Sequence, residues 1–314
     1  MRVVFMGSAP IAVPTLEFLS ERHDVVGVVT QPDKPQGRKR ELTPTAVKQA
    51  ALRLGKPVLE PRKLKAPDFL DALRGTAPEV IVVFAYGRRV PSEVLYMPPH
   101  GCINIHGSIL PKYRGACPIE RGIMAGDAET GITTFYMAEG FDTGDIILTE
   151  AMPIGPDDTG GTLRGKLSRL GAEVIGKTLD AVARGDAPRI GQDHAQATHA
   201  PVITRDEARV DWTRSAREID CQVRACDPEP GAWTTFRGQP LKVRRVVPVE
   251  GEASLVGQEV RPGTIVEVVR DGPLVGTGEG RVIRLADVQP AGKKWMSGAQ
   301  FAAGYRPTVG EKLE

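Results

Sequence analysis

The sequence predicts an α/β protein in two parts: a doubly wound, mostly parallel, Rossmann-like sheet and then a small, OB-like C-terminal β-barrel. Up to about residue 185, short β-branched runs alternate with helix-like segments, a pattern typical of βαβ units with right-handed crossovers. Beyond that point, short β-branched runs are separated by Gly and Pro turns. The length of 314 residues leaves room for two domains.

The first βαβ unit is expected at the N-terminus. "RVVFMG" at residues 2–7 is a β-branched run that ends in glycine, as a buried strand often does. Residues 10–22 carry apolar positions at helical spacing and prolines near their start, which favours a helix that opens with proline. Residues 23–30, "HDVVGVVT", predict the second strand.

The following segments complete the predicted sheet. Residues 31–44 have the composition of a loop. A helix is expected over residues 43–55, with Thr43 as its N-cap and Pro44 in its first position. Three further strands and a long helix are expected, at residues 79–87, 101–106 and 131–139 for the strands and 158–185 for the helix.

The change of character along the chain predicts two domains and a connection. The N-terminal domain is expected over residues 1–187. Residues 188–206 belong to a stretch rich in Gly, Pro, Ala and polar residues, which is typical of a linker. Residues 207–314 are expected to form the small barrel, of the five-stranded kind that binds oligonucleotides.

The composition excludes several classes of protein. Apolar residues make up 41% and charged residues 25% of the chain, as in ordinary globular proteins. The four cysteines form no CxxC pair and have no matching histidine cluster, so we expect no metal and a reducing compartment. No run approaches the roughly 18 apolar residues of a membrane span, and no signal-peptide pattern opens the chain. We expect a cytoplasmic protein without a membrane partner, and a monomer.

One predicted strand carries polar residues where apolar ones would be expected. In "GCINIHGSILPKYRGACP", residues 101–118, Asn104 and His106 are two apart and therefore share one face of the strand. A buried amide or imidazole without a partner costs roughly 1–3 kcal/mol. In open α/β sheets, ligands bind at the carboxyl ends of the strands, so a functional site would explain both residues.

A carboxylate follows the next predicted strand. Asp142 lies in the turn "EGFDTGD", residues 139–145, and would come within reach of His106 if the two strands were neighbours. A carboxylate behind an imidazole fixes its tautomer and raises its basicity. The amide of Asn104 offers donors for a developing oxyanion. Together, these residue types indicate acyl transfer to an external nucleophile, without an acyl-enzyme.

Each of these residues also has a structural explanation. An Asn–X–His pair on a strand is often a hydrogen-bonded pair, and an aspartate in a glycine-flanked turn is by default an Asx-turn former. Ser108 lacks the G-x-S-x-G context of a nucleophile elbow. Cys102 and Cys117 are better explained as small buried apolar residues than as partners of His106.

Two nucleotide-binding motifs are absent from the sequence. "GSAP", residues 7–10, holds one of the three glycines of a dinucleotide-binding turn, which disfavours NAD. No P-loop is present.

The segment at residues 101–147 closely resembles the core of the folate-dependent formyltransferases. Members of that family share an Asn–X–His on a strand, an S-[LI]-L-P loop and an aspartate in a D-T-G-D turn. Here these positions are Asn104, His106 and Asp142, with the loop formed by Ser108, Ile109, Leu110 and Pro111. The resemblance implies the fold of that family.

Four further segments resemble the family members that act on methionyl-tRNA, at residues 2–19, 29–51, 224–243 and 292–307. The last two lie in the C-terminal part, so the resemblance covers nearly the whole chain. It implies 10-formyltetrahydrofolate as donor and the α-amine of methionine on initiator tRNA as acceptor.

The resemblance also implies roles for particular residues. Asn104 and protonated His106, together or singly, would hold the oxyanion, and Asp142 would orient His106. The proton of the amine would go to His106 or to a water that it positions. The folate would lie along residues 84–90 and 103–111, against Arg89, Val90 and the loop from Ser108 to Pro111. Arg88 and Arg89 depart from the apolar pair expected at those positions, and they either disturb the pterin pocket or point to solvent.

Charge placement favours an RNA partner more than the net charge of +2 does. Residues 33–65 contain ten basic and three acidic residues, although a solvated face would show the same excess. Candidate RNA contacts on the basic loop at 34–40 are Arg38, Lys39 and Arg40. In the C-terminal part the candidates are Lys242, Arg244, Arg245, Lys293 and Lys294, with Trp212, Trp233 and Trp295 available either to stack on bases or to pack in the core.

Three other functions compete with this hypothesis. A formyltransferase for an amino-sugar nucleotide would share the N-terminal core but usually carries a different tail. Hydrolysis of the folate donor would replace the amine with water. A non-catalytic RNA-binding module would have no reason to keep Asn104, His106 and Asp142 together.

Overall fold

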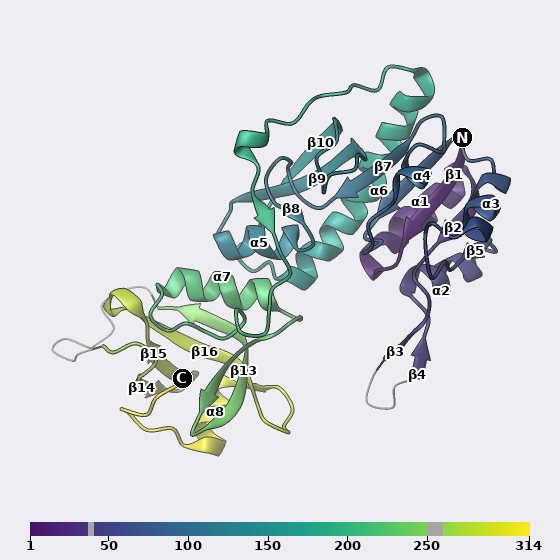
Figure 1. Ribbon diagram of the computed structural model, residues 1–314. Helices are drawn as coiled ribbons and strands as arrows, with labels where there is room; N and C mark the ends of the chain where they lie inside the picture. Colours follow the sequence, from purple (N-terminus) through teal and green to yellow (C-terminus); the bar gives the residue numbers. More distant parts are fainter. Residues whose placement is uncertain (37–40, 250–259) are drawn as a thin grey trace. The chain divides into compact units, whose positions relative to one another are not determined.

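The computed structural model describes residues 1–36, 41–249 and 260–314 (Figure 1). The chain divides into two compact units that do not follow continuous ranges. The first unit comprises Met1–Pro118, Glu129–Pro153 and Arg164–Pro201, and the second comprises Ile119–Ala128, Ile154–Leu163 and Val202–Glu314. The domain boundaries expected from the sequence, 1–187 and 207–314, stay a prediction.

Within the described residues, seven strands form the central sheet of the first unit, in the order β10-β9-β7-β6-β1-β2-β5. Strands β7, β6, β1, β2 and β5 run parallel, while β9 is antiparallel to both β7 and β10. The mostly parallel sheet predicted from the sequence is confirmed. Its strands span Arg2–Gly7 (β1), Asp24–Val29 (β2), Val58–Leu59 (β5), Val80–Phe84 (β6), Cys102–His106 (β7), Glu129–Tyr136 (β9) and Ile146–Pro153 (β10).

Helices cover both faces of this sheet, as buried apolar strands such as β1 and β6 require. Ile81 and Val83 of β6 pack in one cluster with Leu73 of α3, whereas Phe84 and Ile105 lie close to Gly171 of α6. The helices of the first unit span Val13–Arg22 (α1, after a 3₁₀ turn at Pro10–Ala12), Ala46–Arg53 (α2), Pro67–Gly75 (α3) and Ser92–Leu95 (α4), with most of Gly160–Arg184 (α6). Helix α5, Pro118–Ala125, belongs to the second unit apart from its first residue. Among the helices of the described residues, none is long and apolar enough to cross a membrane.

The segment expected to be a loop at residues 31–44 instead contains a hairpin. Strand β3 (Lys34–Gln36) pairs antiparallel with β4 (Glu41–Thr43) (Figure 1). The prediction of Thr43 as N-cap was therefore wrong: a residue before proline favours extended backbone, so Thr43 ends a strand. The N-cap of α2 is Thr45, whose hydroxyl accepts a hydrogen bond from the Lys48 amide.

The second unit is an antiparallel sheet flanked by two helices. In the part that the structure describes, the strand order is β12-β13-β16-β15-β14, with β17 paired to β16. The strands span Ala232–Phe236 (β12), Gln239–Pro248 (β13), Ile265–Val269 (β14), Gly272–Gly276 (β15), Val282–Pro290 (β16) and Met296–Ser297 (β17). Helix α7 spans Ala216–Cys226 and α8 spans Gly298–Tyr305.

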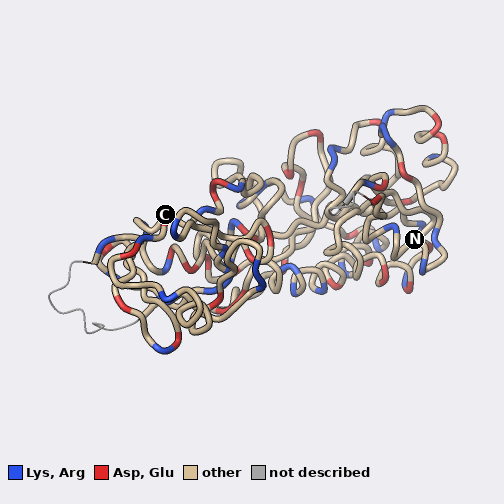
Figure 2. Tube along the Cα trace, turned by 90° about the horizontal axis from the view of Figure 1, so that it is seen from below, with Lys and Arg blue, Asp and Glu red and all other residues tan. Residues whose placement is uncertain are grey.

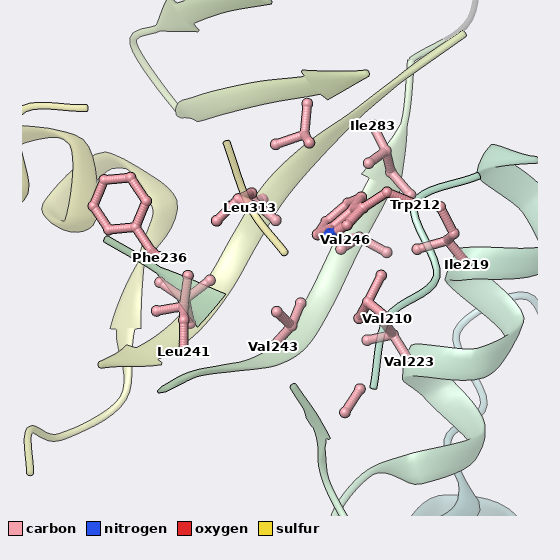
Figure 3. Packing of buried hydrophobic residues seen from close by; sticks show 14 of the residues in the cluster. Val210, Trp212, Ile219, Val223, Phe236, Leu241, Val243, Val246, Ile283 and Leu313 are labelled. Carbon is pink, nitrogen blue, oxygen red and sulfur yellow. The ribbon is translucent and has the colours of Figure 1, made fainter. Parts of the chain in front are cut away.

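The last residues of the chain close this sheet into a barrel. Leu313 bridges to Phe236 at the end of β12, and its amide donates to the carbonyl of Gly263 beside β14 over 2.7 Å. The two edge strands are thus joined through one short segment. The Leu313 side chain is 3% exposed and lies among Phe236, Leu241 and Val246 in the barrel core (Figure 3).

The segment expected as a linker pairs with the first unit over much of its length. Its residues include a 3₁₀ turn at His194–Gln196 and strand β11 (His199–Ala200). Strand β11 pairs in parallel with β8 (Arg114–Gly115), which lies in the loop after β7. The glycine- and proline-rich composition therefore marks an irregular but hydrogen-bonded segment.

Because Leu313 fills the barrel core and joins its edges, we predict that Leu313→Ala destabilises the second unit by about 2–5 kcal/mol, the usual cost of such a cavity. All three tryptophans lie in this unit, so urea unfolding followed by tryptophan fluorescence reports on it. Val309→Ala, at a side chain that is 63% exposed, is the control. Equal unfolding midpoints for the two variants would contradict the closing role of Leu313.

Candidate active site

Strand β7 places Asn104 and His106 on the face of the sheet that carries α3. Val83 pairs with Asn104, and Cys102, two residues before Asn104, packs in the α3 cluster. Alternate residues share a face, so both polar residues lie on that side. Asn104 is half-buried, and His106 is 5% exposed. The two residues are thus at the carboxyl end of a buried strand, as the sequence predicted.

The hydrogen bond at Nε2 of His106 defines the tautomer of the imidazole. Nε2 lies 2.8 Å from the backbone carbonyl oxygen of Tyr113. A carbonyl oxygen only accepts, so Nε2 carries the hydrogen and donates it. The lone pair of the neutral ring is then on Nδ1, which lies 3.7 Å from Oδ2 of Asp142. The nitrogen beside the carboxylate is therefore the one that can take up a proton.

The Asp142 carboxylate is fixed by the backbone of a different loop. The amide of Gly115 donates to Oδ2 over 2.8 Å, whereas 3.7 Å to His106 is too long for a hydrogen bond. Asp142 has φ = +52°, in the left-handed region that non-glycine residues seldom adopt. The side chain therefore does not simply stabilise its own turn, which was the structural explanation considered for it.

Gly144 allows the turn that contains Asp142 to lie close to β9. A Cβ at this position would collide with the carbonyl oxygen of Tyr136, the last residue of β9. A larger residue would push the turn away from the strand and Asp142 with it.

The loop after β7 is held by Thr133 of β9. The Thr133 hydroxyl donates to the carbonyl of Ser108 over 2.7 Å and accepts from the Leu110 amide over 3.2 Å. The Ser108 hydroxyl itself donates to the carbonyl of Lys112, so it serves the loop and not a nucleophilic role. The Leu110 side chain is buried, while Ile109 and Pro111 are half-buried.

A cavity of about 550 Å³ lies beyond the carboxyl end of β6. Val90 is buried in its wall, which also includes the half-buried Arg88 and the exposed Arg89. Arg88 donates to the carbonyls of Pro61 and Arg62, and Arg89 donates to the carbonyl of Glu139 over 2.9 Å. Four of the lining side chains are cationic and one is a carboxylate; they are Arg62, Lys65, Arg88 and Arg89 against Glu139.

The Cys102 thiol beside the site is a poor nucleophile. Burial raises the pKa of Cys102, and its thiol donates to the carbonyl of Val94. No group of three or more His, Cys, Asp or Glu side chains has the arrangement of a metal site within residues 1–36, 41–249 and 260–314.

The candidate RNA contacts are only partly described. Arg38, Lys39 and Arg40 lie outside the described residues. Lys242 and Lys293 are exposed, and the Arg244 guanidinium lies 3.2 Å from Asp227 and 4.3 Å from the centre of the Trp295 ring. Figure 2 shows basic and acidic residues interspersed along the trace.

The three tryptophans differ in what they can contact. Trp212 is buried in the barrel core, where its Nε1 donates to the Thr234 hydroxyl, so the core-packing explanation applies to it (Figure 3). Trp233 and Trp295 are half-buried, with arginine side chains over their rings.

Comparison with known families decides what kind of protein carries this site. The model of the formyl transferase family matches residues 1–179, and that of the formyl transferase C-terminal domain matches residues 202–306. The chain belongs to the formyl transferase family. It is therefore a one-carbon transferase, and a folate is the co-substrate that this family implies.

Similar proteins of known name extend over nearly the same length. The methionyl-tRNA formyltransferase of Pelotomaculum thermopropionicum is 47% identical over 97% of this chain and 96% of its own. That of Geobacter sulfurreducens is 43% identical over 100% of this chain and 96% of its own.

Solved structures share the fold at low sequence identity. An N-formyltransferase from Helicobacter canadensis, solved with folinic acid and dTDP-3-aminofucose, has a TM-score of 0.65 at 18% identity, over 92% of this chain and 99% of its own. The methionyl-tRNA formyltransferase from Clostridium thermocellum has a TM-score of 0.55 at 14% identity, over 81% and 95%.

Four residues that hold the site were missed by the sequence analysis: Tyr113, Thr133, Gln192, whose side-chain amide donates to the carbonyls of Asp142 and Gly144, and Arg114, which donates to Gln192. Thr133 lies in a β-rich run that could be predicted, but its partner at Ser108 could not. Tyr113 acts through its carbonyl, which no side-chain pattern reveals. Gln192 lies in the segment whose composition indicated a linker.

Because Cys102 is buried and burial raises the pKa of Cys226 to about 12, we predict that neither thiol is alkylated by iodoacetamide at pH 8 in the folded protein. At that pH each stays protonated, and only the thiolate reacts. Peptide mass spectrometry measures the modification, with urea-unfolded protein as the reactive control. If Cys102 were alkylated as fast in the folded protein as in the urea-unfolded protein, a reactive cysteine–histidine pair at the site would have to be considered again.

Proposed function

We propose that this enzyme transfers a formyl group from 10-formyltetrahydrofolate to the α-amine of methionine on initiator tRNA, by direct acyl transfer without an acyl-enzyme. The observation that carries the proposal is the convergence of Asn104, His106 and Asp142 at the end of β7, in a chain similar over nearly its whole length to methionyl-tRNA formyltransferases.

The site residues then have distinct roles. The bound donor supplies a formyl group on nitrogen, ready for attack by the methionyl amine. The amide of Asn104 donates to the formyl oxygen as negative charge develops there. His106 takes the proton of the attacking amine at Nδ1, since Nε2 is occupied by the Tyr113 carbonyl. The same proton can then be returned to the folate nitrogen, which leaves as its bond to the formyl carbon breaks.

Asp142 acts on His106 through charge. Its Oδ2 lies 3.7 Å from the nitrogen that becomes protonated, and the Gly115 amide holds it in place. When Nδ1 takes up the amine proton during the reaction, the negative charge of the carboxylate lies beside the positive charge that develops there. Asp142 keeps its own place and does not take the proton.

The cavity beside β6 is the place we propose for the folate. Its volume of about 550 Å³ lies within the usual range for small-molecule sites, roughly 300–1,000 Å³. The p-aminobenzoyl-glutamate part of a folate ends in carboxylates, which Arg62, Arg88 and Arg89 would attract. The pterin would lie toward the loop of Ser108, Ile109, Leu110 and Pro111.

An amino-sugar acceptor is the closest alternative. The Helicobacter canadensis enzyme has the same fold, but at 18% identity the likeness speaks for the fold alone. The match to the C-terminal formyl transferase domain and the relatives at 43–47% identity favour the tRNA acceptor. We propose Lys242, Arg244 and Lys293, with Arg38, Lys39 and Arg40, as contacts to the RNA backbone.

The test is transfer of labelled formyl from 10-formyltetrahydrofolate to methionyl initiator tRNA, beside free methionine. We predict transfer to the charged tRNA alone. His106→Ala should lower kcat by roughly 10²–10⁴-fold, because the proton acceptor is lost, and Asn104→Ala by roughly 10²–10³-fold, because an oxyanion donor is lost.

His100→Ala is the matched control, since His100 lies in the turn before β7 and contributes its backbone amide there. Transfer to a small amino sugar but not to tRNA would contradict the proposal that methionyl-tRNA is the acceptor. Equal activity of His106→Ala and His100→Ala would contradict the role of His106 as the proton acceptor.

Because Arg88 and Arg89 would meet the carboxylates of the folate, we predict that Arg88→Gln and Arg89→Gln each raise the KM for the donor about three- to tenfold, as expected for a part-exposed charge pair. The effect should shrink at high salt, while kcat stays within about twofold. Arg53→Gln, at an exposed arginine of α2 that pairs with Glu17, is the control. An unchanged KM would place the folate elsewhere.

A further inference from the structure

The segment at residues 190–200, called the strap here, contacts the active-site loops of the first unit. It was expected to be a linker, yet it is hydrogen-bonded at both ends. Ile190 exchanges two backbone hydrogen bonds with Ile146, the first residue of β10, and the carbonyl of Ala200 accepts from the amides of Ala116 and Cys117. Between these anchors, the strap passes both loops that flank His106.

Gln192 holds the turn that carries Asp142. Its Nε2 donates to the carbonyl of Asp142 over 2.9 Å and to the carbonyl of Gly144 over 2.8 Å. Both hydrogens of the side-chain amide are thus used on two carbonyls of one turn. This fixes the turn at the residue whose carboxylate faces His106.

Arg114 fixes Gln192 from the other side. Its Nη2 donates to Oε1 of Gln192 over 2.6 Å, and its Nε donates to the same oxygen over 3.2 Å. The Arg114 Nη2 also lies 2.9 Å from Nδ1 of His194 in the strap. Arg114 is 7% exposed, so this charge depends on these acceptors for its burial.

The strap also fixes the second partner of His106. The hydroxyl of Thr198 accepts from the Tyr113 amide over 2.8 Å, and the carbonyl of Thr198 accepts from the Arg114 amide over 2.8 Å. Tyr113 supplies the carbonyl that receives Nε2–H of His106. The strap therefore holds both groups that face the His106 ring: the Tyr113 carbonyl at Nε2 and the Asp142 carboxylate beside Nδ1.

We propose that Gln192 is a positioning residue for catalysis, acting through the Asp142 turn, and that the strap is part of the active-site framework. The inference rests on the proposed function. When the two Nε2 donors are lost, the turn relaxes and the carboxylate leaves its place beside Nδ1 of His106. Formyl transfer then slows, although folate binding, which uses the cavity beside β6, does not change.

Gln192→Glu tests this role with little change of shape. Glutamate keeps an oxygen for Arg114 but turns the second position from a donor into an acceptor facing two carbonyl oxygens. We expect kcat to fall about 10- to 100-fold, while the KM for the donor stays within twofold of wild type. The range for kcat corresponds to the loss of one or two hydrogen bonds, at roughly 1.4 kcal/mol for each tenfold change in rate. Gln192→Ala should behave alike, and Gln196→Ala, at an exposed glutamine of the same strap, should behave as wild type.

A double-mutant cycle separates positioning from general stability. If Gln192 acts through the Asp142 carboxylate, Gln192→Glu should slow Asp142→Asn by less than about twofold. Additive effects in the cycle, wild-type kcat in Gln192→Glu, or a raised KM at unchanged kcat would each overturn the proposal. Absence of formyl transfer in the wild-type enzyme itself would instead count against the proposed function. Thermal unfolding of each variant ensures that kcat is compared well below its midpoint.

Discussion

The site depends on the direction of one strand. Strand β9 runs antiparallel to β7, so it ends opposite Ile103 and not opposite His106. The turn that follows must return along β7 by three residues, about 10 Å at the rise of a strand, before Asp142 can face His106. Gly144, the Gly115 amide and the side chains of the strap hold it there. If β9 ran parallel to β7, the turn after it would lie at the carboxyl end of β7, beside His106, without these contacts.

The polar face of β7 is stable because its neighbours supply partners. His106 is almost fully buried, and a buried imidazole without a hydrogen bond would cost roughly 1–3 kcal/mol. The Tyr113 carbonyl offsets this cost at Nε2 and leaves Nδ1 beside the carboxylate. The contact that makes the residue tolerable in the core is therefore also the contact that selects its reactive nitrogen.

The sequence was sufficient for features that depend on local pattern and failed for those that depend on long-range contacts. The strand at 102–106 and its polar pair follow from spacing, and the mostly parallel sheet follows from alternation. The hairpin of β3 and β4 was missed because the segment is rich in proline and charged residues and lacks a β-branched run, and the closure of the barrel by Leu313 has no local signature. Gln192 was invisible for the same reason, since its partners are 48 and 50 residues away.

The arginines and lysines of this chain divide by role, which explains why charge counting alone says little about RNA. Several arginines are tied into the fold: Arg114 to the strap, Arg237 to Glu311 and Arg224 to Asp220. The planar guanidinium suits such fixed, multiple hydrogen bonds, whereas lysine is a compact charge on a flexible stem. The exposed lysines at 242 and 293 fit contacts to a phosphate backbone, where position matters less than charge. Arg114, Arg224 and Arg237 therefore serve architecture, and a count of basic residues that included them would overstate the charge that is available to RNA.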